Sequence, residues 1–283
     1  MPDYNPTLLR RVLMLRQVPL LAAADLDELA TVAENMIESR LPAGASVARA
    51  GKRVTSVHLI IEGRIEGNGH AWGPRQLFGA LEVLAGRDAA ADAIAATDTR
   101  TLELPARDVA ELLEDNFGLL IATLRDLAAR MIRIAPPTSR LPGFSSDALG
   151  LVERVIMFRK QLPFVGACLD ALTALAHTSE EVRWPVGTVV ARAGERASDG
   201  LIIVEGSLRT SRGEELFSGA SLGHLETLAN LHHIDTIETV SAVRALRSSG
   251  PAMLDVLEDH TDVGLAMIAT FAAAMLDTPN HMN

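Results

Sequence analysis

The side chains best suited to binding a metal stand together at His232, His233 and Asp235. Imidazole nitrogens and a carboxylate oxygen are ligands that zinc accepts. Adjacent side chains on a strand point to opposite faces, however, and no second group of ligands accompanies these three. We therefore expect a solvated loop and no metal site, with metal binding as the alternative.

Cys168 is the single cysteine of the chain, so it cannot form an internal disulfide. A nucleophilic cysteine needs a partner that activates it, and no His and Asn/Asp motif accompanies Cys168. As a small apolar residue before Leu169, it is expected in or near the core. There is also no glycine-rich phosphate loop and no repeated acid and base pair. The sequence predicts no catalytic residues, no cofactor and no enzymatic activity.

An internal repeat at a shift of 143 to 144 residues is the strongest signal in the chain. Residues 40–51 match residues 183–194 without a gap. The match extends through 60–63 with 203–206, 79–85 with 223–229 and 113–115 with 257–259, and upstream through 16–20 with 160–164. The repeated unit is therefore a whole domain.

Three prolines and a glycine interrupt residues 135–143, between the two copies. Proline cannot continue a helix or a strand ladder, so this segment is expected to be a linker. The predicted organisation is a first domain over 1–135, a linker over 136–148 and a second domain over 149–283.

Each copy begins with apolar residues at helical spacing and continues with short strands punctuated by glycines. In the first copy we expect helices near 8–13 and 26–32, strands at 47–50, 57–61 and 94–104, and a second helical stretch over 112–131. The predicted fold class is a β-roll or jelly roll with flanking α-helices, duplicated in tandem.

This order resembles the cyclic nucleotide-binding domain family, which includes the catabolite activator and the regulatory subunits of kinases. The motifs that carry the resemblance are Pro19-Leu20-Leu21 and Pro163-Phe164, then 41–44 and 184–187, then 60–63. The resemblance covers nearly the whole chain, twice. A transcription factor of this type also has a helix-turn-helix after the closing helix, and residues 278–283 offer none.

The resemblance implies a phosphate-binding cassette, Phe-Gly-Glu-Leu-Ala, followed about ten residues later by Arg-Ala or Arg-Ser. The arginine meets the cyclic phosphate and the glutamate accepts from a ribose hydroxyl. Here Gly79 and Gly223 keep the glycine, but Ala80 and His224 replace the glutamate. The ligand is therefore expected to lose its ribose contact in both copies.

The arginine position falls on Ala89 or Ala90 in the first copy, and between His233 and Thr236 in the second. Arg87 comes two or three residues early and is expected to be a solvated loop residue. The retained glutamates, Glu82 and Glu226, follow the glycine by three residues and are expected in the first turn of a helix. Both cassettes are degenerate, so ordinary binding of cyclic AMP is expected to be lost.

A net charge of -10 and a pI near 5.3 disfavour binding to nucleic acid or to an anionic membrane. The longest apolar run, residues 263–276, is shorter than the roughly 20 residues of a membrane span. The N-terminus carries arginines where a secretory signal is apolar. We expect a cytoplasmic protein with no membrane span and no nucleic-acid partner.

The helix expected over 263–276 has no polar stripe beyond Thr270. One apolar face would then remain for a homodimer or a protein partner, unless another part of the chain covers it. Trp72 is a candidate exposed contact residue, whereas Trp184 is expected to pack. These features favour a non-enzymatic regulatory or scaffold protein. The alternatives are a sensor that binds a cyclic nucleotide or another small ligand in a non-standard way and, more distantly, an unrecognised enzyme.

Overall fold

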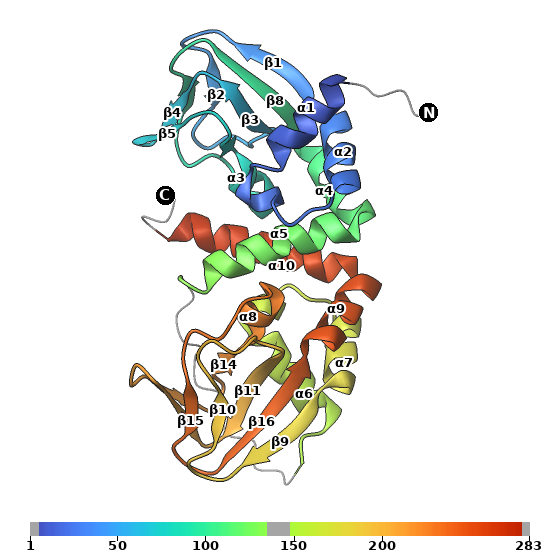
Figure 1. Cartoon of the computed structure of the whole chain (residues 1–283), viewed down its shortest axis with the longest axis vertical. Helices are drawn as coiled ribbons and strands as arrows, with labels where there is room; N and C mark the ends of the chain where they lie inside the picture. The colour runs from blue at the N-terminus through green and yellow to red at the C-terminus, as the bar shows by residue number, and fades with distance from the viewer. Residues whose placement is uncertain (1–5, 135–147, 279–283) are drawn as a thin grey trace. The chain divides into compact units, whose positions relative to one another are not determined.

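The structure is a computed structural model that describes residues 6–134 and 148–278. It divides into two compact units (Figure 1). The first unit comprises Met1–Asp126 and Phe271–Asn283, and the second comprises Leu127–Thr270. The domain limits expected from the sequence stay a prediction, and all but residue 148 of the expected linker lies outside the described residues.

The first unit opens with α1 (Pro6–Leu15), a 3-10 helix η1 (Pro19–Leu21) and α2 (Leu26–Asn35). The start of α2 is fixed by a capping box, in which the Asp25 carboxylate accepts from the Glu28 backbone N–H at 2.9 Å. In return, the Glu28 carboxylate accepts from the backbone N–H of Asp25 at 2.8 Å. Leu29, Val32 and Ala33 form its buried face.

Two four-stranded antiparallel sheets form the first roll. Its strands are β1 (Ile37–Leu41), β2 (Ser46–Ala48), β3 (Ser56–Glu62), β4 (Ile65–Gly67), β5 (His70–Trp72), β6 (Leu77–Phe78), β7 (Ala93–Ala95) and β8 (Thr99–Pro105). The strand orders are β1-β8-β3-β6 and β2-β7-β4-β5. Ile60, Ile65, Phe78 and Ala93 form a buried cluster of this roll.

Trp72 is half-buried and packs against that core, so the expectation of an exposed contact residue was wrong. Its ring packs against the buried cluster and meets the ring of Phe78 edge-on, with 5.1 Å between the centroids. The short β4–β5 hairpin turns it inward, because Trp72 pairs with the fully buried Ile65. Trp184, expected to pack, does pack against the core of the second roll.

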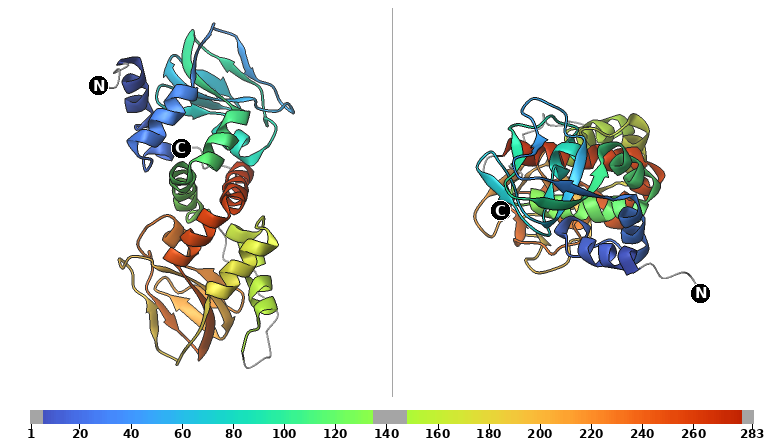
Figure 2. Two further views of the ribbon diagram at one scale, coloured as in Figure 1. Left: turned by 90° about the vertical axis from the view of Figure 1, so that its right-hand side faces the viewer. Right: turned by 90° about the horizontal axis from the view of Figure 1, so that it is seen from above.

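Three helices complete the first unit: α3 (Ala80–Ala85), α4 (Ala106–Asp115) and α5 (Phe117–Met131), of which α5 continues into the second unit. Figure 2 shows that α1, α2 and α4 lie together on one side of the first roll. The short α3 lies between strands β6 and β7 in the chain, where the cassette was expected.

The second unit repeats this plan. It contains α6 (Leu151–Arg159), η2 (Leu162–Phe164), α7 (Leu169–Thr178), β9 (Glu180–Trp184), β10 (Val189–Ala191), β11 (Asp199–Glu205), β12 (Ser207–Thr210), β13 (Glu215–Phe217), β14 (Ser221–Leu222), α8 (His224–Leu228), β15 (Ile237–Thr239), β16 (Val243–Ser249), α9 (Gly250–Asp259) and α10 (Thr261–Asp277), of which the part from Phe271 onward belongs to the first unit. Its sheets have the orders β14-β11-β16-β9 and β10-β15-β12-β13, which match the first unit strand for strand. The expected fold class, a duplicated β-roll with flanking helices, is confirmed.

The shift between the copies is 143 residues from the 3-10 helices as far as β3 and 144 residues from β6 onward. The 3-10 helices begin at Pro19 and Leu162, which differ by 143. The sequence pairing of 16–20 with 160–164 was therefore wrong by one residue. The two segments have similar residues, with a proline in each, and this similarity favoured the wrong register. In the structure, Leu15 corresponds to Phe158, and both side chains are fully buried.

The apolar run 263–276 lies within α10, and all of its residues are buried or half-buried. Val263, Met267, Ile268, Phe271 and Met275 are its most buried large side chains. Among the described residues, no helix is both long and apolar enough to cross a bilayer.

Candidate functional site

Both cassette segments turn sharply at a glycine. Gly79 and Gly223 precede α3 and α8 with φ of 80° and 79°, in the left-handed region that favours glycine. A Cβ at Gly79 would lie 2.9 Å from the carbonyl oxygen of Ser56, and one at Gly223 would lie 2.4 Å from that of Asp199. The glycine is therefore required by the roll itself, whether or not a ligand binds.

The two residues that replace the family's glutamate face the helical side of the fold. His224 is 2% exposed, and its ring meets that of Phe164 edge-on, with 5.8 Å between the centroids. The Nδ1 atom lies 2.8 Å from Oγ of Ser221. Burial lowers the pKa of His224 from 6.5 to about 4, so the ring is neutral at pH 7. A buried neutral ring of this kind is a packing residue with one polar contact.

In the first unit, Ala80 borders an apolar cavity of about 60 Å³. The lining comes from η1, α2, α3, α4, α5, β3 and β8, and from the ends of α1 and β6. Of the described residues that line it, Thr123 is the one polar residue, and none of the residues of α3 is fully buried. By contrast, α8 buries His224 and Leu228. The first cassette helix is therefore less tightly packed than the second.

Glu82 and Glu226 lie in the first turns of α3 and α8, as the sequence suggested. Both are half-buried. Their backbone carbonyl oxygens accept from the N–H groups of Arg87 and Leu231, at 2.9 and 2.8 Å, where each helix ends. Their carboxylates favour the positive end of a short helix and would oppose a phosphate placed there.

The arginine position of the first cassette is part of the roll backbone. Ala89 is 6% exposed, its N–H donates to Lys52 at 2.9 Å and its carbonyl oxygen accepts from Gly51 at 2.8 Å. Ala90 is exposed. Neither methyl group offers a phosphate a hydrogen bond or a charge.

Arg87, the nearest cation of the cassette, is already paired. Its guanidinium binds both carboxylate oxygens of Asp277, at the end of α10 within the first unit, and Nη2 lies 2.9 Å from Oδ2. The hydrogen bond from Arg87 lowers the pKa of Asp277. Arg87 is thus an exposed residue of the loop after α3, as expected, and an exposed ion pair with Asp277 holds it.

In the second cassette, the residues at the arginine position form hydrogen bonds within the roll. The N–H of His233 donates to the carbonyl oxygen of Glu195 at 2.8 Å, and Oγ1 of Thr236 accepts from the N–H of Ala193 at 3.1 Å. The Asp235 carboxylate accepts from Arg212 at 3.0 Å and from Ser211 at 2.9 Å. The Asp235 carboxylate is thus engaged by side chains of the same roll.

Two arginines that the sequence reasoning missed hold the other end of each cassette helix. Arg53 donates to the carbonyl oxygen of Gly86, and Arg196 donates to the side-chain oxygen of Asn230. Gly86 and Asn230 both end their helices in the left-handed conformation, with φ of 62° and 57°. The repeat shift of 143 that relates the two arginines was the signal for this role.

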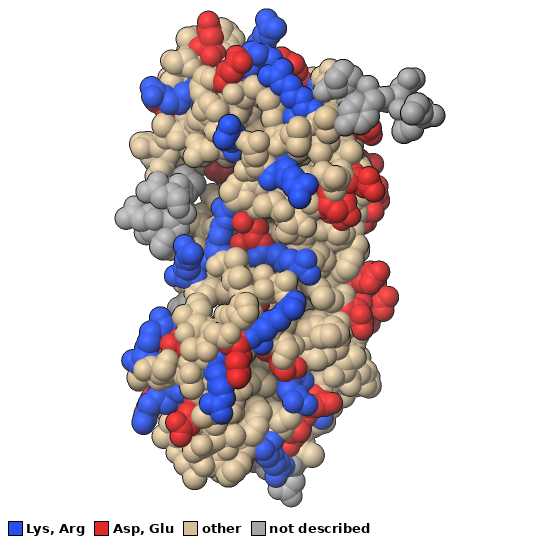
Figure 3. Space-filling view, viewed as in Figure 1, with Lys and Arg blue, Asp and Glu red and all other residues tan. Residues whose placement is uncertain are grey.

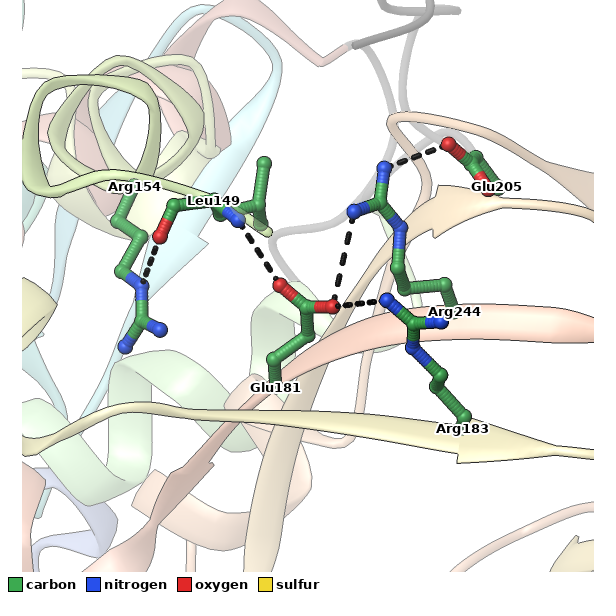
Figure 4. Close-up of polar contacts among 6 residues, drawn as sticks. All are labelled: Leu149, Arg154, Glu181, Arg183, Glu205 and Arg244. Carbon is green, nitrogen blue, oxygen red and sulfur yellow. Dashed lines mark hydrogen bonds and ion pairs between the residues drawn. The ribbon is translucent and has the colours of Figure 1, made fainter. Parts of the chain in front are cut away.

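An ion network centred on the buried Arg244 joins three strands of the second unit (Figure 4). Arg244 on β16 is 5% exposed, and its Nη2 lies 2.5 Å from Oε1 of Glu205 on β11. Its Nη1 lies 3.6 Å from Oε1 of Glu181 on β9. Burial raises the pKa of Glu181, but the hydrogen bonds from the N–H of Leu149 and from Arg183, with the charge of Arg244, bring it below its usual value.

The first unit contains the same network in a more exposed form. Arg100 donates to Glu38 at 2.7 Å and to Glu62 at 3.2 Å, and its side chain is 34% exposed. These residues correspond to Arg244, Glu181 and Glu205 by the repeat. Since it recurs in both copies, the network is part of the roll scaffold.

Comparison with protein families identifies one match. Residues 38–116 match the family model described as "Cyclic nucleotide-binding domain". No curated protein matches the chain.

Several solved structures are similar to the chain. The structure titled "cAMP bound PfPKA-R (141-441)" is 13% identical with a TM-score of 0.42, and covers 93% of this chain and 88% of its own. A regulatory subunit of a cAMP-independent protein kinase A from Trypanosoma brucei is 16% identical with a TM-score of 0.39, and covers 93% and 94%. The N-terminal domain of a transcriptional regulator from Streptomyces coelicolor A3(2) is 25% identical with a TM-score of 0.39, and covers 42% and 90%.

The matched segment begins in β1, passes through the first roll and its cassette helix, and ends just after α4. It contains the glycine turn at Gly79, the alanine pair at 89–90 and the closing strand β8. The match to the cyclic nucleotide-binding domain model therefore covers the first β-roll of this chain, whose strand order the second β-roll repeats.

Proposed function

We propose that the chain is a non-enzymatic regulatory or scaffold protein, whose two degenerate cyclic nucleotide-binding-like units bind another protein. The observation that carries this proposal is the alanine pair at the arginine position of the first cassette. Ala89 is buried in roll hydrogen bonds, and Arg87 is held by Asp277. The second cassette has no arginine at the equivalent positions either.

The size of the missing interaction supports a change of function. Truncating one partner of a buried, hydrogen-bonded charge pair costs about 2–5 kcal/mol, or about 30-fold to several thousand-fold in affinity. In each unit the family's arginine and its glutamate are both replaced. A cyclic nucleotide would have to desolvate its phosphate without a matching cation, so we expect no binding at physiological concentration.

Two apolar features of the fold support the binding of a protein partner. The cavity beside α3 is lined by apolar side chains, and α10 presents a face of half-buried residues that includes Ala266, Ala269 and Ala273. Apolar surface of this kind is typical of protein interfaces. On the face shown in Figure 3, basic and acidic side chains are interspersed, so nucleic acid finds no continuous basic stripe there.

A second candidate is a sensor that binds a small ligand in a non-standard way. The same cavity favours it, because α3 lies against the cavity with no fully buried residue of its own. An apolar ligand entering there would complete the packing of the cassette helix. The two candidates therefore differ in what occupies the cavity.

Thermal-shift screening and affinity capture distinguish them. A native-state ligand present at 100 times its Kd stabilises a protein by about 2.7 kcal/mol, which a melting curve detects. We expect no shift with cyclic mono- or dinucleotides, and capture of a specific protein by the full chain as bait. The capture control is the variant Leu84→Glu, which places a charge beside the cavity. A ligand that shifts the melting curve, with no protein captured, would favour the sensor and refute the scaffold.

A further inference from the structure

We propose that Cys168, His260 and Asp262 of the second unit form a binding site for a divalent transition metal of the zinc class. One ligand atom from each side chain, the sulfur, an imidazole nitrogen and a carboxylate oxygen, lies within 4.8 Å of the other two. Cys168 and the other two residues lie about ninety positions apart in the chain, so only the fold brings them together.

The helices hold these residues at one corner of the unit. Cys168 is the N-cap residue of α7, and its sulfur makes no capping hydrogen bond. His260 separates α9 from α10, and Asp262 lies in the first turn of α10. The loop before Cys168 is pressed against α10, since a Cβ at Gly166 would lie 3.0 Å from Cβ of Ala266. Cys168, which was expected in or near the core, is half-buried.

The donor set selects the class of metal. Thiolate and imidazole ligands suit zinc and its neighbours, whereas magnesium and calcium take oxygen ligands almost alone. Zinc sites with three protein ligands keep a fourth position for water or for a further ligand. A thiolate and a carboxylate together would neutralise the charge of the ion. The ligand atoms of a tetrahedral site lie closer together than 4.8 Å. Rotations of the three side chains can bring their ligand atoms to that shorter spacing.

The first unit shows that this corner does not need such a cluster to fold. The equivalent of Cys168 is Asp25, whose carboxylate caps α2 together with Glu28. The Glu28 carboxylate also covers Gly118, the equivalent of Asp262, where a Cβ would lie 1.5 Å from Oε1. Asn116, the equivalent of His260, donates to the carbonyl oxygen of Leu112 at 2.9 Å.

The second unit departs from this arrangement at four positions together. Ala171 replaces Glu28, which removes the capping carboxylate and the group that covers the corner. Asp25, Asn116 and Gly118 become Cys168, His260 and Asp262. Within the described residues, no hydrogen bond or ion pair engages these three side chains. Where the first unit has a capping box, the second unit thus has three neighbouring side chains that can ligate a metal. These three side chains have no other partner among the described residues.

The test uses the full chain, stripped with a chelator and kept reduced. Zinc is titrated against a chromophoric competitor, and cobalt is added in parallel because thiolate coordination gives cobalt an intense charge-transfer absorption. We expect one zinc ion per chain at this site and the thiolate band with cobalt. Cobalt binding without the thiolate band, or no zinc binding, would overturn the proposal.

Variants locate the site. Cys168→Ser, His260→Gln and Asp262→Asn should each weaken zinc binding at least 10-fold, since each removes or weakens a direct ligand. The matched control is His177→Gln on the same helix α7, which should bind zinc as the wild type does. The variant C168D/A171E/H260N/D262G installs the first unit's residues, and should keep a cooperative melting curve while losing the site. Unchanged affinity in Cys168→Ser and His260→Gln would contradict the assignment.

Discussion

The ring of His224 packs directly on the backbone of Gly200, so that a Cβ at Gly200 would lie 2.2 Å from Cδ2 of His224. The first unit has Val57 and Ala80 at the equivalent positions. The two copies therefore fill the space between the cassette helix and the third strand of the roll in opposite ways. The first unit has a large residue on the strand and a small residue on the helix. The second unit has a small residue on the strand and a large residue on the helix.

This relationship predicts that Gly200 and His224 are energetically coupled. Gly200→Ala should destabilise the second unit by about 1–3 kcal/mol, because the added methyl overpacks against the ring. In the double variant with His224→Ala, that penalty should largely disappear, which urea unfolding of the four proteins of the cycle would measure. Strict additivity of the two changes would show that the ring and the glycine do not share this space.

The same ring predicts a dependence of stability on pH. The pKa of His224 is about 4 in the folded chain and 6.5 in its ordinary state, so the unfolded chain binds a proton that the folded chain excludes. The contribution of the neutral ring is complete above pH 6.5 and is lost as the pH falls toward 4, by about 3 kcal/mol at most.

The swap variant G200V/H224A, which carries the first unit's residues, is the control. Burial also lowers the pKa of His58, in the first unit, so part of the acid sensitivity should remain in the variant. The free energy of unfolding should fall less steeply in the variant than in the wild type between pH 6.5 and 4. Parallel curves would exclude His224 as a source of the pH dependence.

The sequence was sufficient to predict the duplicated roll. Glycines at turns and apolar periodicity are local signals, and both recur in the second copy at nearly the same shift along the chain. The sequence also located the glycine turns at Gly79 and Gly223. It did not show the direction of a side chain: His224 turns toward the helices only because Gly200, a residue 24 positions earlier, leaves room for it. Cys168 and His260 meet only through the packing of two helices that are far apart in the sequence, and neither has a motif.

The ion network predicts a difference between the two copies. Arg244→Met should destabilise the second unit by about 3 kcal/mol, at the low end for a broken buried pair, because Glu205 remains half-exposed. Arg100→Met changes the equivalent residue in the first unit and should cost less, since solvent screens an exposed pair. Thermal and urea unfolding of both variants measure the difference. Equal losses would show that burial of Arg244 is not what gives the network its strength.

The half-buried face of α10 predicts the site of association. Ala269→Glu with Ala273→Glu should abolish self-association or capture of the protein partner, because two charges would be placed in an apolar interface. Sedimentation velocity and affinity capture measure this, and circular dichroism establishes that the variant is folded. An unchanged sedimentation coefficient together with unchanged capture would place the interface elsewhere.

The central claim is that neither cassette holds a cyclic nucleotide phosphate, and calorimetry of the full chain with cyclic AMP and cyclic GMP tests it most directly. We predict no saturable heat at micromolar nucleotide, in a sample whose cooperative melting shows that it is folded. Micromolar affinity in either unit would contradict the account, and loss of that affinity in Arg87→Ala or Arg53→Ala would identify the cation recruited in place of the missing arginine.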